Sequence, residues 1–448
     1  MLQFNLRAVR ALCAMLLAVC ALPAHAALDN FYSATGKLGL SVDGCGTAVT
    51  TTCTVNVDKP SAGATVRAAF LMSISDGGSN YQIPDGQVKL NSQPVSWDAS
   101  AHIVGVGLYE WNYRADVTAL VKPALDAAPA GLMPFTIDEG PQVEGHALVV
   151  VFNDPAQTSD SSVLLNFGAQ DTTGDTFNIT LASPVDPAAP GARLDMGLGI
   201  AFGYQESGAD QNSIVTVNGQ LLTSSAGGSD DCRDPVPHNG CLITVGGLGD
   251  SNDNPADPTA PATNARSDDE LYSLLPFVDA STTAIAVHTV NPSNDDNIFF
   301  AYFHTSAPAI VGAGILLSQT VNTHPVGSSH TVRALVTDTS GTPQANVTVT
   351  FTVTNGPNLG ETGTAVTNAS GFADYTYTDS GGEGNDTIEA STMSAGVRMA
   401  SNALNVSWIK SGGGGAAPAV PTLSEAGTML AVLLLAGVGA ARLRRRQR

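Results

Sequence analysis

The stretch Ala345–Gly356, which reads ANVTVTFTVTNG, decides the fold class of this chain. Its apolar residues alternate with threonines along the whole stretch: Val347, Val349, Phe351 and Val353. Successive side chains of a strand point to opposite faces of a sheet. The alternation therefore predicts a strand with one face in a hydrophobic core and the other face in water.

Similar signals continue on both sides of this strand. A turn is expected at Thr337–Pro343, a second alternating strand at Phe372–Tyr377, and a last strand from Ala403 to Trp408. About seven short strands in about a hundred residues are typical of an immunoglobulin-like sandwich of two sheets. We therefore expect such a domain over residues 311–409.

This segment resembles the group 1 bacterial Ig-like domain of the intimin/invasin adhesins. The matching stretches are the run from Asp338 through Gly341 and Pro343 to Phe351, TNASGFA at residues 367–373, and GNDTIEA at residues 384–390. In that family the module acts mostly as a spacer that holds a binding domain away from the membrane. The resemblance implies the same role here, with a single copy and hence no long stalk.

Residues 27–310 also predict an all-β structure, because short apolar runs alternate with turn residues. The run Ala147–Phe152 is apolar on both faces and predicts a central strand. Proline- and aspartate-rich stretches at 154–161 and 183–192 separate groups of strands. One large sandwich and two smaller ones both remain open, with a candidate break near 155–160.

Helical signals are few in this part of the chain. Asp116–Val121 predicts a short capped helix. Ser267 and Glu270 have the spacing of a capping box, and the leucines that follow predict a second helix.

The N-terminus predicts a secretory signal peptide over residues 1–26. Arg7 and Arg10 precede an apolar run from Ala11 to Leu22, and Ala24-His25-Ala26 supplies an A-x-A cleavage site. An N-terminal membrane anchor is disfavoured because the apolar run is too short to span a bilayer.

The C-terminus combines a short motif, an apolar run and a cluster of arginines. Ala426–Ala441 carries no charge, and as a helix at ~1.5 Å per residue it would be roughly 24 Å long. Such a helix can span a bilayer that thins locally. The arginines that follow would stay on the cytoplasmic side, which places the body of the protein outside.

The motif before this run resembles the IPTL-CTERM sorting signal of Gram-negative bacteria, which reads Ile-Pro-Thr-Leu-Ser-Glu-Trp-Gly. The matching residues are Val420, Pro421, Thr422, Leu423, Ser424, Glu425 and Gly427, while Val420 replaces Ile and Ala426 replaces Trp. The resemblance covers residues 420–448 and implies an exosortase-type processing enzyme as a partner. A glycine-rich linker at 410–419 would keep the motif accessible.

Charge limits the partners of the mature chain. Removing residues 1–26 and 420–448 leaves 12 basic and 39 acidic residues, a net charge of about −27. A surface of this charge repels nucleic acid and anionic lipid but attracts divalent cations. Nucleic acid is therefore excluded as a partner, and the membrane is expected to contact only the C-terminal helix before processing.

Four cysteines remain after signal cleavage, as two local pairs. Cys45 lies near Cys53, and Cys232 lies near Cys241. Three connectivities are open, and proximity favours the two local bridges, which an oxidising compartment would preserve. The spacing does not match a zinc motif.

No catalytic motif is visible, and we expect no enzymatic activity. The sequence contains no H-E-x-x-H helix and no G-x-S-x-G elbow. The glycines of Gly197–Gly203 lack the spacing of a dinucleotide loop and predict a strand with close backbone packing. A pair of carboxylates for glycoside hydrolysis remains an alternative, because acidic residues are plentiful.

Calcium is the candidate cofactor, because carboxylate and amide oxygens are the ligands that it prefers. The stretch 249–257, GDSNDNPAD, concentrates such oxygens but lacks the glycine and glutamate of an EF-hand. Solvated loops with Asx-turns are the structural alternative. The candidate ligands are Asp250, Asn252, Asp253, Asp257, Asp268, Asp269, Asp295 and Asp296.

The sequence thus predicts an exported cell-envelope or surface protein with a structural, adhesive or matrix role. It would be anchored transiently in the inner membrane and processed at its C-terminal signal. Two alternatives remain, a calcium-dependent carbohydrate-binding module and a secreted hydrolase with an unrecognised site. A surface glycan or matrix polysaccharide is the expected ligand class.

Overall fold

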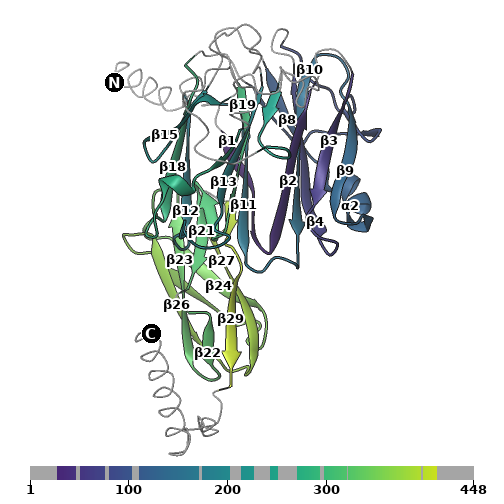
Figure 1. The fold of residues 1–448 in the computed structure, drawn as a ribbon. Coiled ribbons are helices and arrows are strands. Elements are labelled where there is room, and N and C mark those ends of the chain that lie inside the picture. Colours follow the sequence, from purple (N-terminus) through teal and green to yellow (C-terminus); the bar gives the residue numbers. More distant parts are fainter. Residues whose placement is uncertain are drawn as a thin grey trace, which may run out of the picture.

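The structure is a computed structural model of the whole chain, and it is almost entirely β. It describes residues 28–410, apart from segments 47–50, 76–79, 103–109, 171–173, 202–212, 227–242, 251–269, 293–296, 320 and 395–396. The described residues form an N-terminal body and a smaller C-terminal sandwich, placed end to end (Figure 1). Among them, no helix has both the length and the apolar character needed to span a membrane. The predicted C-terminal helix lies outside the described residues.

Two sheets of the N-terminal body form its first sandwich. Sheet 1 has the strand order β3 (Thr52–Lys59), β9 (Gly131–Asp138), β5 (Lys89–Leu90), β6 (Gln93–Pro94). Sheet 2 has the order β2 (Leu38–Cys45), β10 (Val143–Asn153), β4 (Thr65–Ser75), β8 (Trp111–Asp116), β7 (Ala99–His102). Helix α2 (Thr118–Ala127) contributes Val121 and Leu125 to the core between these sheets.

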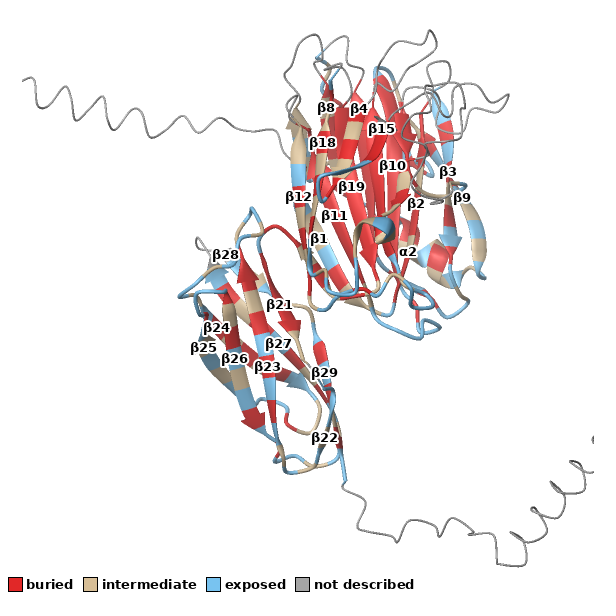
Figure 2. Ribbon diagram, turned by 60° about the vertical axis from the view of Figure 1, so that its left-hand side comes forward, coloured by how far each residue is buried: buried red, intermediate tan, exposed pale blue. Residues whose placement is uncertain are grey.

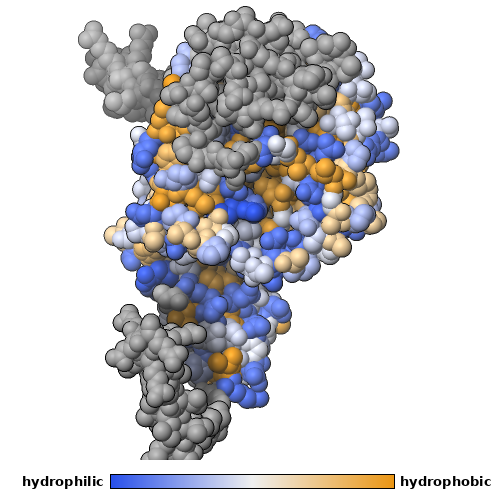
Figure 3. Space-filling model, viewed as in Figure 1, coloured by the Kyte–Doolittle hydropathy of each residue, from blue (hydrophilic) through white to orange (hydrophobic). Residues whose placement is uncertain are grey.

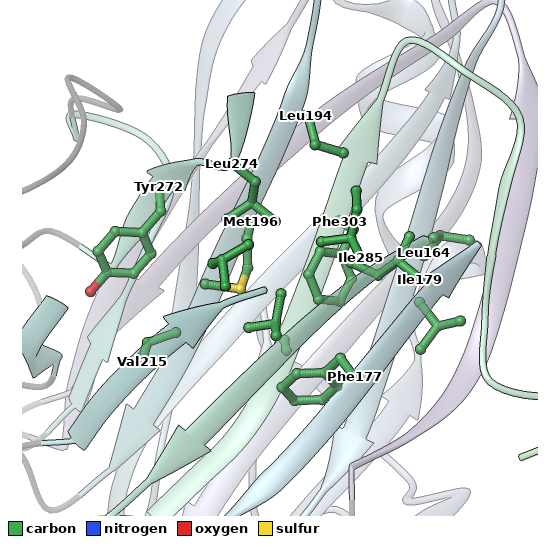
Figure 4. Packing of buried hydrophobic residues seen from close by; sticks show 14 of the residues in the cluster. Leu164, Phe177, Ile179, Leu194, Met196, Val215, Tyr272, Leu274, Ile285 and Phe303 are labelled. Carbon is green, nitrogen blue, oxygen red and sulfur yellow. The ribbon is translucent and has the colours of Figure 1, made fainter. Parts of the chain in front are cut away.

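Two further sheets form the second sandwich. Sheet 3 has the order β1 (Leu28–Gly36), β11 (Ser161–Gly168), β19 (Asn297–Thr305), β13 (Leu194–Ala201), β16 (Ile243–Val245), and β17 (Leu271–Ser273) also pairs with β13. Sheet 4 has the order β15 (Gln220–Ala226), β14 (Ser213–Val217), β18 (Ala284–Val290), β12 (Asp175–Leu181), β20 (Ala309–Val311). Figure 4 shows their shared core, where Phe177 of β12 packs beside Phe303 of β19.

A third hydrophobic core lies between sheets 2 and 3, so the four sheets form one stack. This core contains Phe70, Val149 and Leu165. Strands β10 and β19 are consequently buried on both faces, as the broad red strands of Figure 2 show. The prediction that Ala147–Phe152 forms a central strand is confirmed.

The connection at 154–160 leads from sheet 2 to sheet 3, where the sequence suggested a break. The two sandwiches are nevertheless interlocked, because β1 pairs with β11 and so belongs to sheet 3. Two close approaches in sheet 3 explain the predicted glycine-rich strand. A Cβ on Gly197 would lie 2.0 Å from Cε1 of Tyr302, and a Cβ on Gly199 would lie 2.8 Å from Cζ of Phe299.

The C-terminal sandwich contains two sheets around a core centred on Phe351 and Trp408. Sheet 5 has the order β21 (Gly314–Ser318), β23 (Ser329–Thr337), β26 (Phe372–Thr378). Sheet 6 has the order β22 (Thr323–Pro325), β29 (Leu404–Ile409), β27 (Gly384–Ser394), β24 (Thr348–Asn355), β25 (Thr362–Val366), with β28 (Val397–Ala400) paired to β27. Val349, Phe351 and Val353 of β24 are fully buried, which confirms the alternation read from the sequence.

One predicted helix exists and the other does not. The helix expected at Asp116–Val121 is α2, and Asp116 Oδ1 accepts a hydrogen bond from the Thr118 amide. The helix expected after Ser267 is wrong where it can be seen. Leu271–Ser273 is strand β17 and pairs with β13, and only a single 3-10 turn, η1 (Leu275–Phe277), follows. Pairing with a sheet has overridden a local helical signal.

Candidate functional site

The described residues contain few of the predicted site residues. Of the eight candidate calcium ligands, Asp250 alone is described, while Asn252, Asp253, Asp257, Asp268, Asp269, Asp295 and Asp296 lie outside the described residues. The sorting motif and the pair Cys232 and Cys241 lie outside them too. Cys45 and Cys53 form a disulfide with an S–S distance of 2.02 Å.

A cavity of about 190 Å³ opens where the edges of sheets 2 and 3 meet. Its apolar wall includes Leu40, Leu271 and the ring of Tyr302. Its polar lining includes Arg193 and Asp195, and Arg193 Nε lies 3.6 Å from Asp195 Oδ2. The cavity thus combines apolar side chains with a charged pair.

A hydrogen-bond chain fixes the polar side of this cavity. Arg193 Nη1 lies 3.1 Å from His304 Nδ1, and His304 Nε2 lies 3.2 Å from Ser161 Oγ. Arginine can only donate, so Nδ1 of His304 accepts and the ring is neutral. Burial, reinforced by the charge of Arg193, lowers the pKa of His304 to about 3. The imidazole therefore orients Arg193 without adding charge.

Asp250 lies in the turn that closes one side of the cavity. Its Oδ2 accepts a hydrogen bond of 2.7 Å from the amide of Gly247, a residue that lines the cavity. The carboxylate of Asp250 thus stabilises the turn 247–250.

A second polar cluster is buried beside the Cys45–Cys53 disulfide, in the core between sheets 1 and 2. It contains Ser73 of β4, His146 of β10 and Glu139, which follows β9. Ser73 Oγ lies 2.7 Å from His146 Nδ1, and His146 Nε2 lies 3.9 Å from Glu139 Oε1. All three residues are at most 1% exposed.

Burial controls the protonation of this cluster. It lowers the pKa of His146 to about 3 and raises the pKa of Glu139 to about 8. Both groups are therefore neutral near pH 7. Within the described part of the chain, His146 Nε2 and Glu139 Oε1 have no hydrogen-bond partner, although buried polar atoms usually have one.

Spacing along the chain could not reveal either group of residues. Arg193 and His304 are 111 positions apart, and Ser73 and His146 are 73 apart. The register of paired strands brings them together. The only local signal was His146 itself, a titratable residue at the start of the run that predicts a central strand.

Comparisons with known proteins give no close relative. No family model matches the chain, and no curated protein matches it. A solved structure of the D00-D0 domain of intimin is similar with 18% identity and a TM-score of 0.17, over 27% of this chain and 62% of that one. This chain therefore spans less than two thirds of the intimin structure that it matches.

Two further solved structures are similar along most of the chain. Domains A168–A170 of titin show 8% identity and a TM-score of 0.14, over 84% of this chain and 100% of that one. The C-terminal domain of the BspA AgI/II polypeptide of Streptococcus agalactiae shows 10% identity and a TM-score of 0.11, over 83% and 99%. These TM-scores are too low to carry a structural argument, so the function must be argued from the chain itself.

Proposed function

We propose that this protein is an exported, non-catalytic surface protein of a bacterial envelope with an adhesive or matrix role. The N-terminal body contacts a partner. The C-terminal sandwich, a group 1 bacterial Ig-like domain, acts as a spacer that holds that body away from the cell. An exosortase-type enzyme processes the sorting signal.

The observation that carries this proposal is the polarity of the molecule. Six strands of the body end on the same side of it, farthest from the C-terminal sandwich (Figure 1), at Cys45, Ser75, His102, Gly168, Ala201 and Ala226. The described chain leaves at Lys410, after β29, at the opposite tip (Figure 1). The described chain thus leaves the molecule at one end, and these strand ends lie at the other, where a partner would contact the body.

The junction between body and sandwich supports a presenting role. The amide of Gly312 donates to Asn178 O of β12 across 2.9 Å, and Thr337 Oγ1 of β23 donates to Gly312 O across 2.6 Å. These bonds join the body to sheet 5 through one residue. Hydrophilic residues cover much of the sandwich face seen in Figure 3, as suits a spacer in water.

Two chemical features agree with export. The Cys45–Cys53 bridge persists only where thiols are oxidised. The strongly acidic mature chain stays soluble and repels anionic surfaces. Ser73 and His146 are buried and offer no surface for a substrate, so they give no support to a hydrolase.

The test is to map the C-terminal peptide of the protein recovered from the envelope and from the medium, together with protease shaving of intact cells. We expect a new C-terminus between Pro421 and Gly427 and loss of the N-terminal body on shaving. An intact C-terminus at Arg448, with the body protected in intact cells, would refute surface presentation.

Calcium-dependent carbohydrate binding is a second candidate, favoured by the position of Asp250 beside the cavity. Arg193 and Asp195 offer a donor and an acceptor against an apolar wall, which suits a neutral polyhydroxyl ring. Asp250→Ala with Asp253→Ala is expected to remove any rise in melting temperature with millimolar Ca²⁺. Arg193→Met is expected to abolish retention on immobilised glycans, while Arg333→Met, on the C-terminal sandwich, leaves it unchanged. If the unaltered chain shows neither a rise in melting temperature with Ca²⁺ nor retention on glycans, this candidate is eliminated.

A further inference from the structure

The cluster beside the Cys45–Cys53 disulfide brings together donor atoms of three kinds. The Sγ of Cys53, a ring nitrogen of His146 and a carboxylate oxygen of Glu139 all lie within 4.8 Å of one another. They come from β3, from β10 and from the residue after β9, and antiparallel pairing of β3 with β9 fixes two of them. The arrangement therefore depends on the sheets and not on a mobile loop.

Among the described residues, the donor atoms on His146 and Glu139 have no partner. Within that part of the chain His146 Nε2 and Glu139 Oε1 make no hydrogen bond, and their side chains are 0% and 2% exposed. An unsatisfied buried polar atom is destabilising, so two that face each other call for an explanation, and a bound ion is one.

Ser73 holds the imidazole ring of His146 in one orientation through a hydrogen bond. Its Oγ lies 2.7 Å from Nδ1 of His146. Histidines that bind metal ions almost always donate their other ring N–H to such a partner, which fixes the ring and the tautomer. With Nδ1 donating to Ser73, the lone pair of Nε2 faces Glu139 and Cys53.

We propose that Cys53, His146 and Glu139 form a zinc site that exists only while the Cys45–Cys53 disulfide is open. Thiolate, imidazole and carboxylate are the three ligand types that proteins use for Zn²⁺. Cys45 is bonded to Cys53 in the structure, so after reduction its sulfur remains close enough to supply the fourth ligand of a tetrahedral site.

Opening the site is a two-electron step. A thiol or phosphine reductant donates two electrons, the S–S bond breaks, and each sulfur takes up one proton from water. On binding, the metal displaces the protons from the ligating sulfurs into solvent. Zinc binding and disulfide formation therefore compete for the same sulfur, and bound zinc would delay oxidation of Cys53 during folding.

The experiment uses the full chain with the other four cysteines replaced by serine: Cys13, Cys20, Cys232 and Cys241. Co²⁺ is the probe, because a cobalt–thiolate bond gives a charge-transfer absorption that carboxylates do not give. After phosphine reduction we expect one cobalt per chain with this absorption, displaced by Zn²⁺, and none in the oxidised chain. Zinc should also slow closure of the disulfide by an added oxidant.

Substitutions distinguish residues that bind the metal ion from residues that only pack in the core. His146→Gln and Glu139→Gln are expected to abolish or strongly weaken binding, and Ser73→Ala to weaken it about 10–100-fold. Glu361→Gln, a change on the C-terminal sandwich, should have no effect. A reduced chain that keeps its β circular dichroism but binds no cobalt, or binds it equally well as His146→Gln, would overturn the proposal. If reduction unfolds the chain, refolding on zinc addition supports the site and failure to refold overturns it.

Discussion

Trp408 Nε1 donates a hydrogen bond to Asp386 Oδ2 across 2.6 Å, at the centre of the C-terminal sandwich. The same carboxylate accepts hydrogen bonds from the Tyr377 hydroxyl at 3.1 Å and from the amide and side chain of Asn358 at 2.9 and 2.8 Å. Asp386 is fully buried, so one acidic side chain joins β26, β27, β29 and the turn after β24.

Asp386→Ala is expected to destabilise the C-terminal sandwich by about 3–5 kcal/mol, because several buried donors lose their acceptor at once. Denaturant unfolding followed by tryptophan fluorescence measures the loss. The control is Asp374→Asn, which breaks the exposed pair with Arg333 and should cost less than about 1 kcal/mol. Equal losses for the two variants would show that the buried network adds no stability.

Lys59→Met is expected to cost about 2–4 kcal/mol. The Lys59 side chain is 1% exposed, and its Nζ donates to the carbonyls of Leu125, Asp126 and Ala128 at 2.9, 3.1 and 2.8 Å. These carbonyls lie at the end of helix α2, where backbone acceptors run out of helical partners, although Leu125 O also accepts from the Ala128 amide at 3.2 Å. Lys89→Met, an exposed change in the same sheet, is the control and should alter the free energy of unfolding by at most about 0.5 kcal/mol.

Gly197→Ala is expected to destabilise the N-terminal body by about 2–3 kcal/mol, because the added methyl would overlap the ring of Tyr302. A double-mutant cycle with Tyr302→Ala tests the cause. The double variant should lose less stability than the sum of the two single variants, by about 1–3 kcal/mol. Strict additivity would place the strain elsewhere.

Stability is expected to fall as the solution becomes acidic, partly through His304. Its pKa is lowered to about 3 in the folded chain and is about 6.5 when unfolded, so the unfolded chain binds more protons between these values. The contribution of His304 is complete above pH 6.5 and is lost as pH falls toward 3. Between pH 7 and pH 5 the loss is about 2 kcal/mol.

The free energy of unfolding at pH 7 and pH 5 should therefore differ less in His304→Gln than in the unaltered chain. His324→Gln, in the C-terminal sandwich, is the matched control and should keep most of the original dependence. An unchanged pH dependence in His304→Gln would mean that His304 titrates normally.

The hydrophobic pattern of the sequence correctly predicted strands whose buried residues follow that pattern. Thr348–Asn355 alternates and has one buried face, and the run of β10 is apolar throughout because cores flank it on both sides. The pattern failed at Leu271, where a helical arrangement of leucines forms a strand because β13 offers a free edge.

Long-range pairing carries no local signal, and the candidate sites depend on it. The pairing of β1 with β11 and the meeting of Glu139 with His146 both depend on the register of sheets. Predicting cysteine pairing by proximity succeeded for Cys45 and Cys53 because only seven residues separate them. The calcium prediction stays a prediction, since Asp250 alone can be placed.

The pairing of β1 with β11 also sets the order in which the protein can acquire its structure. The first described strand finds its partner only when residues 161–168 are available, more than a hundred residues later. Until then sheet 2 has no sheet 3 to cover its second apolar face. Non-local pairing of this kind slows folding, and exposed apolar sheets invite aggregation. A chain that emerges N-terminus first would thus pass through an aggregation-prone, partly folded intermediate. A chaperone that binds such intermediates would be needed in the compartment where the chain folds.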